Sequence, residues 1–198
     1  MGGKALPYDA EIEYLESDNT GCWIDTGIIT NSTYTVELEF YSSGRTEGIF
    51  GSRYNYFDKS YELILVSNID QIRYRCNNSQ SQQSSKEAYR NISFNTWNRV
   101  KAALNKLYIN ETLVATLAAA DNFVSNLSYY LFALNTAGQG TNLGKKRIRI
   151  CKIWDGNTLL LDFIPVRKGT VGYMYDKVSG QLFGNAGTGN FVLGSDKT

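Results

Sequence analysis

The chain has 198 residues, of which 42% are hydrophobic, a formal net charge of +1 and no histidine. A chain of this length can bury the core of one domain, and a net charge near zero argues against the basic surface typical of nucleic-acid binding. Without histidine it can form neither a Ser–His–Asp or Cys–His nucleophilic site nor a His-ligated metal site.

The sequence also lacks the signals of membrane insertion and export. No hydrophobic run approaches the ~18 residues that a membrane-spanning helix needs. The first residues, MGGKALPYD, lack the apolar segment of a signal peptide. We therefore expect no nucleic-acid partner, no membrane insertion and no signal peptide in this chain.

The predicted elements are short strands along the whole chain. Only two prolines are present, and tyrosine, phenylalanine and β-branched residues, which favour strands, are frequent. Within 33–41, apolar side chains alternate with threonine and glutamate, which is typical of a strand with one buried face. We expect strands at 11–16, 22–25, 33–41, 47–53, 60–67, 70–76, 87–93, 97–104, 106–110, 112–116, 128–134, 147–154, 158–166, 171–175 and 181–183. So many short strands predict a sandwich or a barrel.

Turn and loop signals separate these strands. Asp155-Gly156 lies between two apolar runs, and this pair favours a tight hairpin turn because glycine accepts a positive φ. The segments 178–180 and 185–187 mark two further turns near the end of the chain. The run at 77–86 is polar and of low complexity, so we expect it to be an exposed loop.

The cysteines and the main basic cluster are assigned structural roles. Cys22, Cys76 and Cys151 are odd in number and widely spaced, so at most one pair could bridge, and we expect small buried side chains. Lys145 to Arg147, with Arg149 beyond them, form a local basic cluster. We expect it to be the solvated end of a loop rather than a phosphate site.

The loop at 53–61 is the strongest candidate for a binding site. A sugar site needs aromatic rings for the apolar faces of the sugar and a few polar side chains for its hydroxyl groups. The predicted ligand-binding residues are Arg53, Tyr54, Asn55, Tyr56, Asp58 and Tyr61. A tyrosine-rich sandwich would show tyrosine-rich loops without any ligand, so this alternative stays open.

Other aromatic and acidic residues are weaker candidates. Further contributors to a sugar site are Tyr129-Tyr130, Asn135-Thr136 and Trp154-Asp155. Trp23, Trp97 and Trp154 are nevertheless expected mainly in the core. We predict no cofactor and no metal, with calcium at Asp58, Asp70 and Asp121 as the alternative, because the spacing of a calcium-binding loop is absent.

Segments from both ends of the chain carry a recognisable pattern. They are LPYDAEIEYLESDNTGCWIDTGI (6–28), DFIPVR (162–167), GYMYDKVSGQLF (172–183) and NAGTGNF (185–191). Together they resemble concanavalin A-like (laminin G/lectin-type) jelly-roll modules of gut phage tail, fibre and head-decoration proteins and of bacterial surface proteins. The resemblance implies an all-β jelly-roll sandwich of two antiparallel sheets. We expect one domain at 10–194, between a leader at 1–9 and a tail at 195–198.

The resemblance also implies a function without catalysis. We expect a virion-associated, lectin-like binding module, located on a virion or an extracellular surface. Its expected partners are a glycan or cell-surface polysaccharide and other virion proteins, and it could form a homo-oligomer. The alternative is a purely structural virion or assembly protein without a sugar site.

The acidic run from Glu11 to Glu16 gives the third alternative. It is similar to the E-I-D-x-x-E strand of laminarinase-type glucanases, whose bulge keeps three acids on one face. The resemblance implies Glu11 as nucleophile and Glu16 as acid/base of a retaining hydrolase, about 5–5.5 Å apart. Glu13 replaces the middle aspartate, and the run lies at the start of the chain rather than on a central strand. A solvated polar face of the first strand therefore remains the preferred interpretation.

Overall fold

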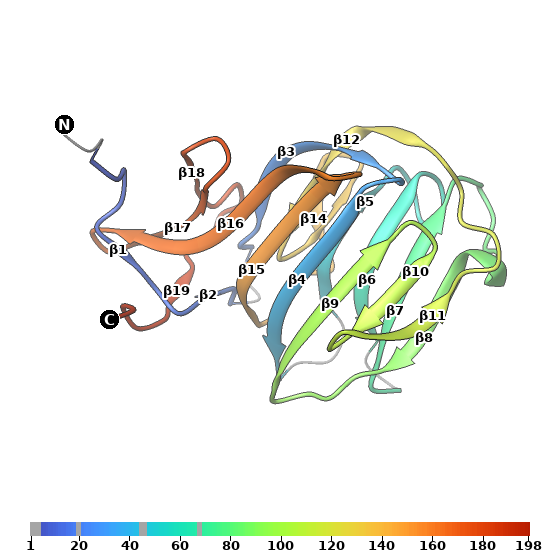
Figure 1. Cartoon of the computed structure of the whole chain (residues 1–198), viewed down its shortest axis with the longest axis horizontal. Helices are drawn as coiled ribbons and strands as arrows, with labels where there is room; N and C mark the ends of the chain where they lie inside the picture. Colours follow the sequence, from blue (N-terminus) through green and yellow to red (C-terminus); the bar gives the residue numbers. More distant parts are fainter. Residues whose placement is uncertain (1–4, 19–20, 44–46, 67–68) are drawn as a thin grey trace.

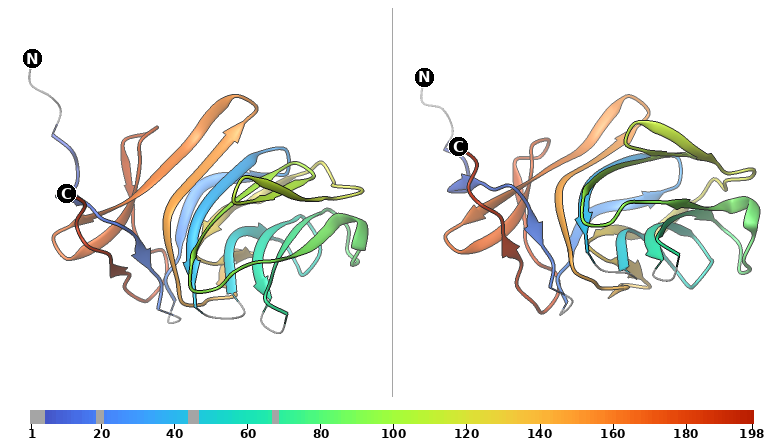
Figure 2. Two further views of the ribbon diagram at one scale, coloured as in Figure 1. Left: turned by 60° about the horizontal axis from the view of Figure 1, so that its bottom comes forward. Right: turned by 90° about the horizontal axis from the view of Figure 1, so that it is seen from below.

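The structure is a computed structural model that describes residues 5–18, 21–43, 47–66 and 69–198. Two β-sheets stack on each other as the layers of a sandwich (Figure 2). Eleven of the described strands form the larger sheet and eight form the smaller one. All but one of their pairings are antiparallel. The expected all-β sandwich of two antiparallel sheets is thus confirmed.

The larger sheet carries the candidate site described below. Its order is β11 (Thr112–Thr116), β10 (Lys106–Ile109), β9 (Trp97–Ala103), β4 (Thr35–Ser42), β15 (Lys146–Asp155), β16 (Thr158–Lys168), β17 (Val171–Asp176) and β18 (Gln181–Phe183). Beside this path, β1 (Ala10–Glu11) pairs with β16, and β2 (Leu15–Glu16) pairs with β15 and β19 (Val192–Leu193). The predicted Asp155-Gly156 hairpin joins β15 to β16, with Asp155 opposite Thr158.

The smaller sheet covers the inner face of the larger one. Its order is β14 (Gln139–Thr141), β13 (Leu134–Thr136), β5 (Glu47–Arg53), β6 (Ser60–Val66), β7 (Gln71–Asn77) and β8 (Glu87–Asn91). β12 (Val124–Leu131) pairs with β5 and with β3 (Ile24–Asn31). The parallel pair is β5 with β13. A single 3₁₀ turn, η1 (Ser84–Lys86), lies in the polar loop between β7 and β8.

The hydrophobic core lies between the two sheets. On β4 the predicted alternation holds, because Val36, Leu38 and Phe40 are at most 1% exposed and belong to the core. Tyr61 of β6 and Tyr129 of β12 meet edge to face in this core, with ring centroids 5.4 Å apart. The residues between the buried positions of β4 therefore face outward, and they line the candidate site described below.

The larger sheet extends beyond the sandwich into a lobe that contains strands from both ends of the chain (Figure 1). β1, β2 and β19 lie there beside β17 and β18. Ile12 forms a bridge with Asp196, and the Lys197 amide donates to the carbonyl of Glu11 at 2.9 Å. The residues expected as a short tail are therefore hydrogen-bonded to the first strand region.

The predicted strand at 11–16 is wrong. The structure has two strands of two residues each, in which Glu11 lies opposite Val166 on β16 and Glu16 lies opposite Arg147 on β15. The chain crosses from one partner strand to another between them, so a single ladder of hydrogen bonds cannot continue. The three acids therefore do not lie along one bulged strand.

Two other predicted strands differ clearly in extent from the structure, and two strands were not predicted. The strand expected at 22–25 is β3, which continues to Asn31, and the strand expected at 128–134 is divided between β12 and β13. The division lies at Phe132, whose φ of +71° breaks the extended backbone. Neither β14 nor β19 was predicted, because each is a short strand whose hydrogen bonds depend on a distant partner.

None of the helices in the described part of the chain is long and apolar enough to cross a membrane.

Candidate functional site

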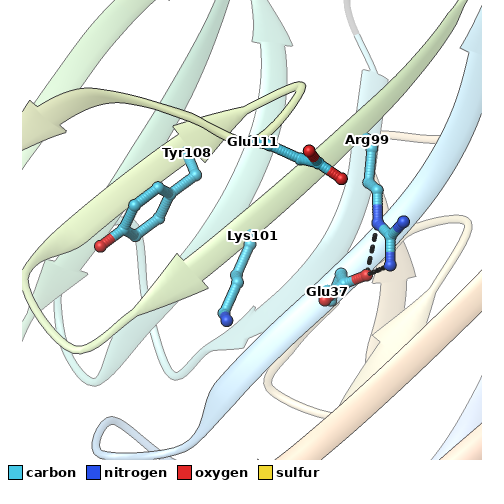
Figure 3. A pocket seen from close by; sticks show the side chains of 5 residues that line it. All are labelled: Glu37, Arg99, Lys101, Tyr108 and Glu111. Atoms are coloured by element: carbon cyan, nitrogen blue, oxygen red, sulfur yellow. Dashed lines mark hydrogen bonds and ion pairs between the residues drawn. The ribbon is translucent and has the colours of Figure 1, made fainter.

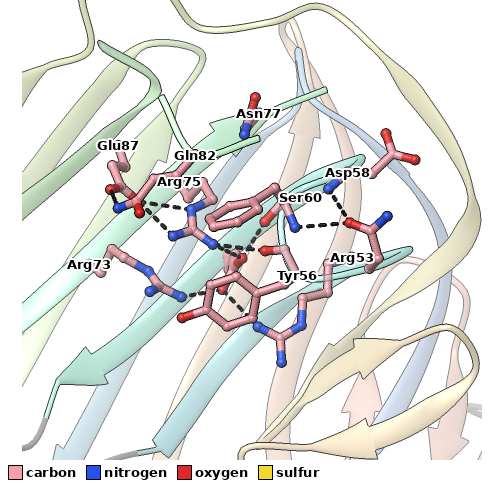
Figure 4. Close-up of polar contacts among 12 residues, drawn as sticks. Arg53, Tyr56, Asp58, Ser60, Arg73, Arg75, Asn77, Gln82 and Glu87 are labelled. Carbon is pink, nitrogen blue, oxygen red and sulfur yellow. Dashed lines mark hydrogen bonds and ion pairs between the residues drawn. The ribbon is translucent and has the colours of Figure 1, made fainter. Parts of the chain in front are cut away.

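The loop expected to bind a ligand crosses the outer face of the smaller sheet (Figure 4). Tyr54 and Tyr56 are 53% and 55% exposed. The Asn55 side chain accepts hydrogen bonds from the amides of Phe57 and Asp58, at 3.0 and 2.8 Å, so it stabilises the turn. The loop thus presents two tyrosine rings to solvent on a backbone held by its own polar residue.

Two of the other predicted loop residues are committed to the protein itself. Tyr61 is fully buried and its hydroxyl donates to the carbonyl of Ala102 at 3.3 Å, so the prediction that it contacts a ligand is wrong. Arg53 is 8% exposed, and its guanidinium donates to Thr136 and Asn142, both at 3.0 Å. Tyr61 fails as a site residue because it is the first inward-facing position of β6.

Beneath the loop, a network of ion pairs surrounds Glu62 (Figure 4). This carboxylate is fully buried and lies 2.7 Å from Arg73, 3.0 Å from Arg75 and 3.7 Å from Arg53. Arg75 also pairs with Glu87 at 2.6 Å. A buried charge is tolerated only when it is paired and hydrogen-bonded. The network therefore links strands β5, β6, β7 and β8 to one another. Its arginines are already paired within the protein.

The ring of Tyr56 covers this network. The guanidinium carbons of Arg53 and Arg75 lie 5.2 and 5.3 Å from its centroid, within the range of a cation–π contact. One ring face is thus occupied by arginine, while half of the side chain stays exposed. The loop therefore presents a partly exposed tyrosine ring above the buried arginines.

A hollow of about 660 Å³ lies on the outer face of the larger sheet. Its lining residues are Glu13, Tyr14, Glu39, Trp97, Arg147, Arg149, Ile150 and Lys197. We call it the Trp97 hollow. It combines two aromatic rings with charged side chains of both signs, a mixture that the sequence had suggested chiefly for the loop at 53–61.

Neighbouring strands of the larger sheet position these side chains. Trp97 begins β9 and lies opposite Tyr41 on β4. On β15 a bulge lies between Ile148 and Ile150, so that Arg149 is the extra residue of that strand. Because a bulge turns neighbouring side chains to the same face, Arg149 and Ile150 can both line the hollow. Alternation in the sequence alone would have placed Ile150 in the core.

Arginines stack against the aromatic rings of the Trp97 hollow. The guanidinium carbon of Arg149 lies 4.3 Å from the ring centroid of Trp97, and that of Arg147 lies 4.5 Å from Tyr14. Arg149 is ion-paired with Glu39, and the Tyr14 and Trp97 centroids are 6.2 Å apart. These contacts fix the side chains before any ligand arrives.

The structure corrects the predicted positions of the basic cluster and of two of the tryptophans. Lys146 is buried inside the sandwich and pairs with Glu47 at 3.6 Å, so it is not the solvated end of a loop. Trp97 and Trp154 are half-buried on the outer face, outside the core cluster, whereas Trp23 packs against that core as expected. In the alternating pattern of β9, Trp97 lies on the face opposite to that of the buried Val100. This alternation was the signal that could have placed Trp97 outside.

A second, smaller hollow of about 350 Å³ lies beside the first, since its Arg99 lies opposite Glu39 of the Trp97 hollow. Figure 3 shows the side chains that line it. It is lined by Glu37, Arg99, Lys101, Tyr108 and Glu111, and we call it the Tyr108 hollow. Arg99 donates from Nε to Glu37 at 2.5 Å. Figure 3 shows the Glu111 carboxylate pointing toward the same guanidinium. This hollow therefore also presents paired charges beside an aromatic ring.

A third hollow, of about 600 Å³, lies in the lobe. It is formed largely by glycines and asparagines of the recognised segments at 172–183 and 185–191. A Cβ at Gly184 would lie 3.3 Å from the ring of Tyr173, so glycine keeps the chain close to that ring. The Asn185 side chain is committed to the amides of Trp23 and Gly187, both at 3.0 Å. The recognised segments thus act mainly as scaffold.

The three acids of the glucanase-like run are placed in different surroundings. Glu16 is 7% exposed and is ion-paired with Arg147. Glu11 lies 3.9 Å from Lys197, and Glu13 lines the Trp97 hollow. Because Glu11 and Glu16 lie on strands with different partners and Glu13 lies between these strands, the one-face arrangement implied by the glucanase resemblance is not found.

The aspartates suggested for calcium do not converge. Asp58 precedes β6 and Asp70 follows it, so the length of this strand, about 20 Å, separates them. Asp121 is paired with Lys86 at 2.6 Å. Within the described residues, no group of three or more cysteine, aspartate or glutamate side chains is placed to hold a metal ion.

The cysteines have the buried environment that the sequence predicts. Cys22, Cys76 and Cys151 are buried and free. Burial, with the nearby Asp18 carboxylate, raises the pKa of the Cys22 thiol to about 11, and burial raises that of Cys76 to about 12. All three remain thiols near neutral pH.

The remaining predicted contributors are mostly structural. Tyr129 is fully buried in the core, and Tyr130 stacks on Trp23 with centroids 6.1 Å apart. Asn135 is 2% exposed and donates to the carbonyl of Ser128 at 2.9 Å. Their positions in the fold leave the outer face of the larger sheet as the best-formed candidate surface.

Comparison with known proteins identifies the fold and no closer relationship. No protein-family model matches the sequence, and no curated protein sequence matches it. A candidate carbohydrate-binding protein from Bacteroides ovatus is similar in structure, with a TM-score of 0.62 and 14% identity over 95% of this chain and 61% of that one. The chain thus spans about three fifths of that protein.

A second similar structure is the CBM40 module of the Ruminococcus gnavus IT-sialidase, bound to α2,3 sialyllactose. Its TM-score is 0.52, at 16% identity, over 76% of this chain and 92% of that module. At these identities the likeness is one of fold. Both proteins share the β-sandwich architecture with this chain.

Proposed function

We propose that this protein is a non-catalytic glycan-binding module whose main binding surface is the Trp97 hollow. The observation that carries the proposal is the joint presence of Tyr14, Trp97 and two arginines in a hollow of about 660 Å³. This volume lies within the ~300–1,000 Å³ of typical small-ligand sites. Sugars bind such surfaces by placing a ring against an aromatic side chain while their hydroxyl groups meet charged or amide side chains.

The fixed geometry of the hollow supports binding. The ion pair between Arg149 and Glu39 and the stacking of Arg147 on Tyr14 hold the polar groups in place. Preorganised side chains lose little freedom on binding, so more of the interaction energy appears as affinity. The comparisons support the same class of ligand, because one similar protein is a candidate carbohydrate-binding protein and another is named for a complex with a sugar.

The surroundings of the acids favour binding over hydrolysis. A retaining hydrolase needs one carboxylic acid kept protonated and a second carboxylate about 5–5.5 Å away. In the Trp97 hollow Glu39 is paired with Arg149, and the nearby Glu16 is paired with Arg147. Both carboxylates are thus held in ion pairs with arginine, rather than placed as the free acid and nucleophile that hydrolysis requires.

The experiment compares two tryptophans on the outer face of the larger sheet. Glycan-array screening of the purified chain should give binding, and isothermal titration of the best ligand should show that Trp97→Ala weakens it more than about tenfold, as for a central aromatic contact. Trp154→Ala is the matched control, because Trp154 is also half-buried on this face but lies outside the hollow. Equal effects of the two substitutions, or silence across a broad array, would refute the proposal.

The loop at 53–61 is proposed as a second, weaker contact surface. Tyr54 and Tyr56 are its exposed rings, with Arg53, Asn55 and Asp58 holding the loop. If the loop contributes, Tyr54→Ala should weaken binding of the same ligand several-fold, as measured by titration. Unchanged affinity in both Tyr54→Ala and Tyr56→Ala would remove the loop from the proposal.

The biological setting that we propose, a virion or an exposed cell surface, rests on the sequence resemblance to gut phage and bacterial surface modules. A purely structural role in such an assembly is the competing function. Immunogold labelling of particles and cells with an antibody against the chain would distinguish a surface location from a cytoplasmic one.

A further inference from the structure

We infer that the Trp97 hollow and the Tyr108 hollow are two ends of one groove that binds an uncharged, linear polysaccharide segment lengthwise along β9. The inference rests on the proposed function and names its ligand class. It differs from a pocket for a single terminal sugar, which would need the first hollow alone.

The register of the sheet makes the two hollows continuous. Trp97, Arg99 and Lys101 alternate with buried residues of β9, so their side chains leave the same face. On the neighbouring β4, Glu39 lies opposite Arg99. Glu39 lines the first hollow and Arg99 the second, so directly paired residues join the two.

The groove is longer than one sugar ring. Trp97 and Lys101 are four residues apart on a strand, which corresponds to about 13 Å at ~3.3 Å per residue. Tyr108 on β10 lies directly opposite Lys101, so an aromatic ring stands at each end. A ring-stacking site at both ends of a hydrogen-bonding strip suits a chain of several linked sugars.

The wall of the second hollow is tied firmly to β9. The Asn110 amide donates to the Arg99 carbonyl at 2.7 Å, and the Arg99 amide donates to the Asn110 side chain at 2.9 Å. Asn110 and Glu111 both have positive φ, of +48° and +70°, and form the turn between β10 and β11. This turn carries Glu111 toward Arg99, as Figure 3 shows.

The charges of the groove are balanced, which points to an uncharged ligand. Among the described residues, the basic side chains that line it are Arg99, Lys101, Arg147, Arg149 and Lys197, and the acidic ones are Glu13, Glu37, Glu39 and Glu111. Glu16 pairs with Arg147 from outside the lining. A surface built to attract a polyanion would instead carry charge of one sign.

Paired charges suit the hydroxyl groups of a neutral sugar. Each guanidinium–carboxylate pair offers donors and acceptors side by side, and vicinal hydroxyl groups can use both. Two such pairs, Arg149 with Glu39 and Arg99 with Glu37, follow one another along the groove. Repeated pairs match the repeated hydroxyl groups of a polysaccharide.

The test is a series of linear neutral oligosaccharides, from mono- to hexasaccharides of β-glucan, β-mannan and β-xylan, titrated calorimetrically into the full chain. Affinity for one series should rise with length and then reach a plateau. Tyr108→Ala should weaken the longer ligands roughly tenfold and leave the shortest binding ligand unchanged, because only the longer ones reach that end. Trp97→Ala should weaken ligands of every length.

The controls separate this inference from the proposed function. Tyr89→Ala, a half-buried tyrosine on β8 of the other sheet, should change nothing, and Lys101→Ala should repeat the length-dependent loss of Tyr108→Ala. Trp97-dependent binding that is independent of length and of Tyr108 would overturn the groove but keep the function. Preferred binding of uronate or sialylated glycans, suppressed by salt, would overturn the uncharged class. Loss of all Trp97-dependent glycan binding would overturn the function itself.

Discussion

Lys146 is a cation enclosed between the two sheets, and its environment explains why it is tolerated. Its ammonium group donates to the carbonyls of Phe132 and Gly144, at 2.8 and 3.1 Å, and lies 3.6 Å from Glu47. Burial lowers the pKa of Lys146 to about 8, although Glu47 opposes the shift, and burial raises the pKa of Glu47. The pair is thus less strongly charged than two surface residues would be.

This environment predicts a rise in stability with pH. Between the folded pKa of about 8 and the ordinary value of 10.5, the unfolded chain holds a proton on Lys146 that the folded chain has lost. Stability therefore increases with pH in this window, by at most about 1.4 kcal/mol per pH unit. Urea unfolding of the natural chain and of Lys146→Met at pH 7.5 to 10 would measure it.

The comparison with Lys146→Met isolates this residue from the cysteines and tyrosines, which titrate in both chains. The difference in unfolding free energy between the two chains should move in favour of the natural chain as the pH rises. A difference that stays constant over this range would show that Lys146 remains charged in the folded state.

At the level of the elements, the ion-pair network joins strands β5, β6 and β7 through the carboxylate of Glu62, and β8 is joined through Glu87. Glu62 on β6 pairs with Arg53, Arg73 and Arg75 on the neighbouring strands. Removing one partner of a buried ion pair costs about 3–5 kcal/mol, because the remaining charges stay buried without compensation. We therefore expect Glu62→Gln to lower the unfolding free energy by roughly 3 kcal/mol.

The matched control is Glu111→Gln, which lies in an exposed turn and should change stability by less than about 0.5 kcal/mol. Chemical denaturation of both variants, followed by tryptophan fluorescence, gives the two free energies. Similar small losses in both variants would mean that the network contributes little and that the sheet is held by its core alone.

Individual elements differ in how far the sequence could predict them. β4 and the β15–β16 hairpin were predictable, because alternation and the Asp155-Gly156 turn are local features. β1 and β2 were not, because their separation depends on which strand each one pairs with. The bulge at Arg149 was hidden for the same reason, since Arg147 to Cys151 reads as regular alternation.

At the scale of the whole molecule, the two outer faces of the sandwich have different characters. The smaller sheet buries its arginines beneath Tyr56, whereas the larger sheet keeps its arginines and aromatic rings on a hollowed face. The loop at 53–61 was predictable from composition because its residues are adjacent in sequence. The groove draws on segments from Glu13 to Lys197, so no local window of sequence contains it.

The sequence by itself determined the all-β class and most strand positions, because these follow from local alternation and turn chemistry, whereas the choice of a two-sheet sandwich over a barrel rested on the family resemblance. It also determined that histidine-based catalysis is absent. Only the tertiary structure decided that Trp97 lies outside, that Tyr61 and Lys146 lie inside, and that Glu11 and Glu16 have different partner strands. The physical reason is that strand pairing and burial depend on contacts between residues far apart in the chain.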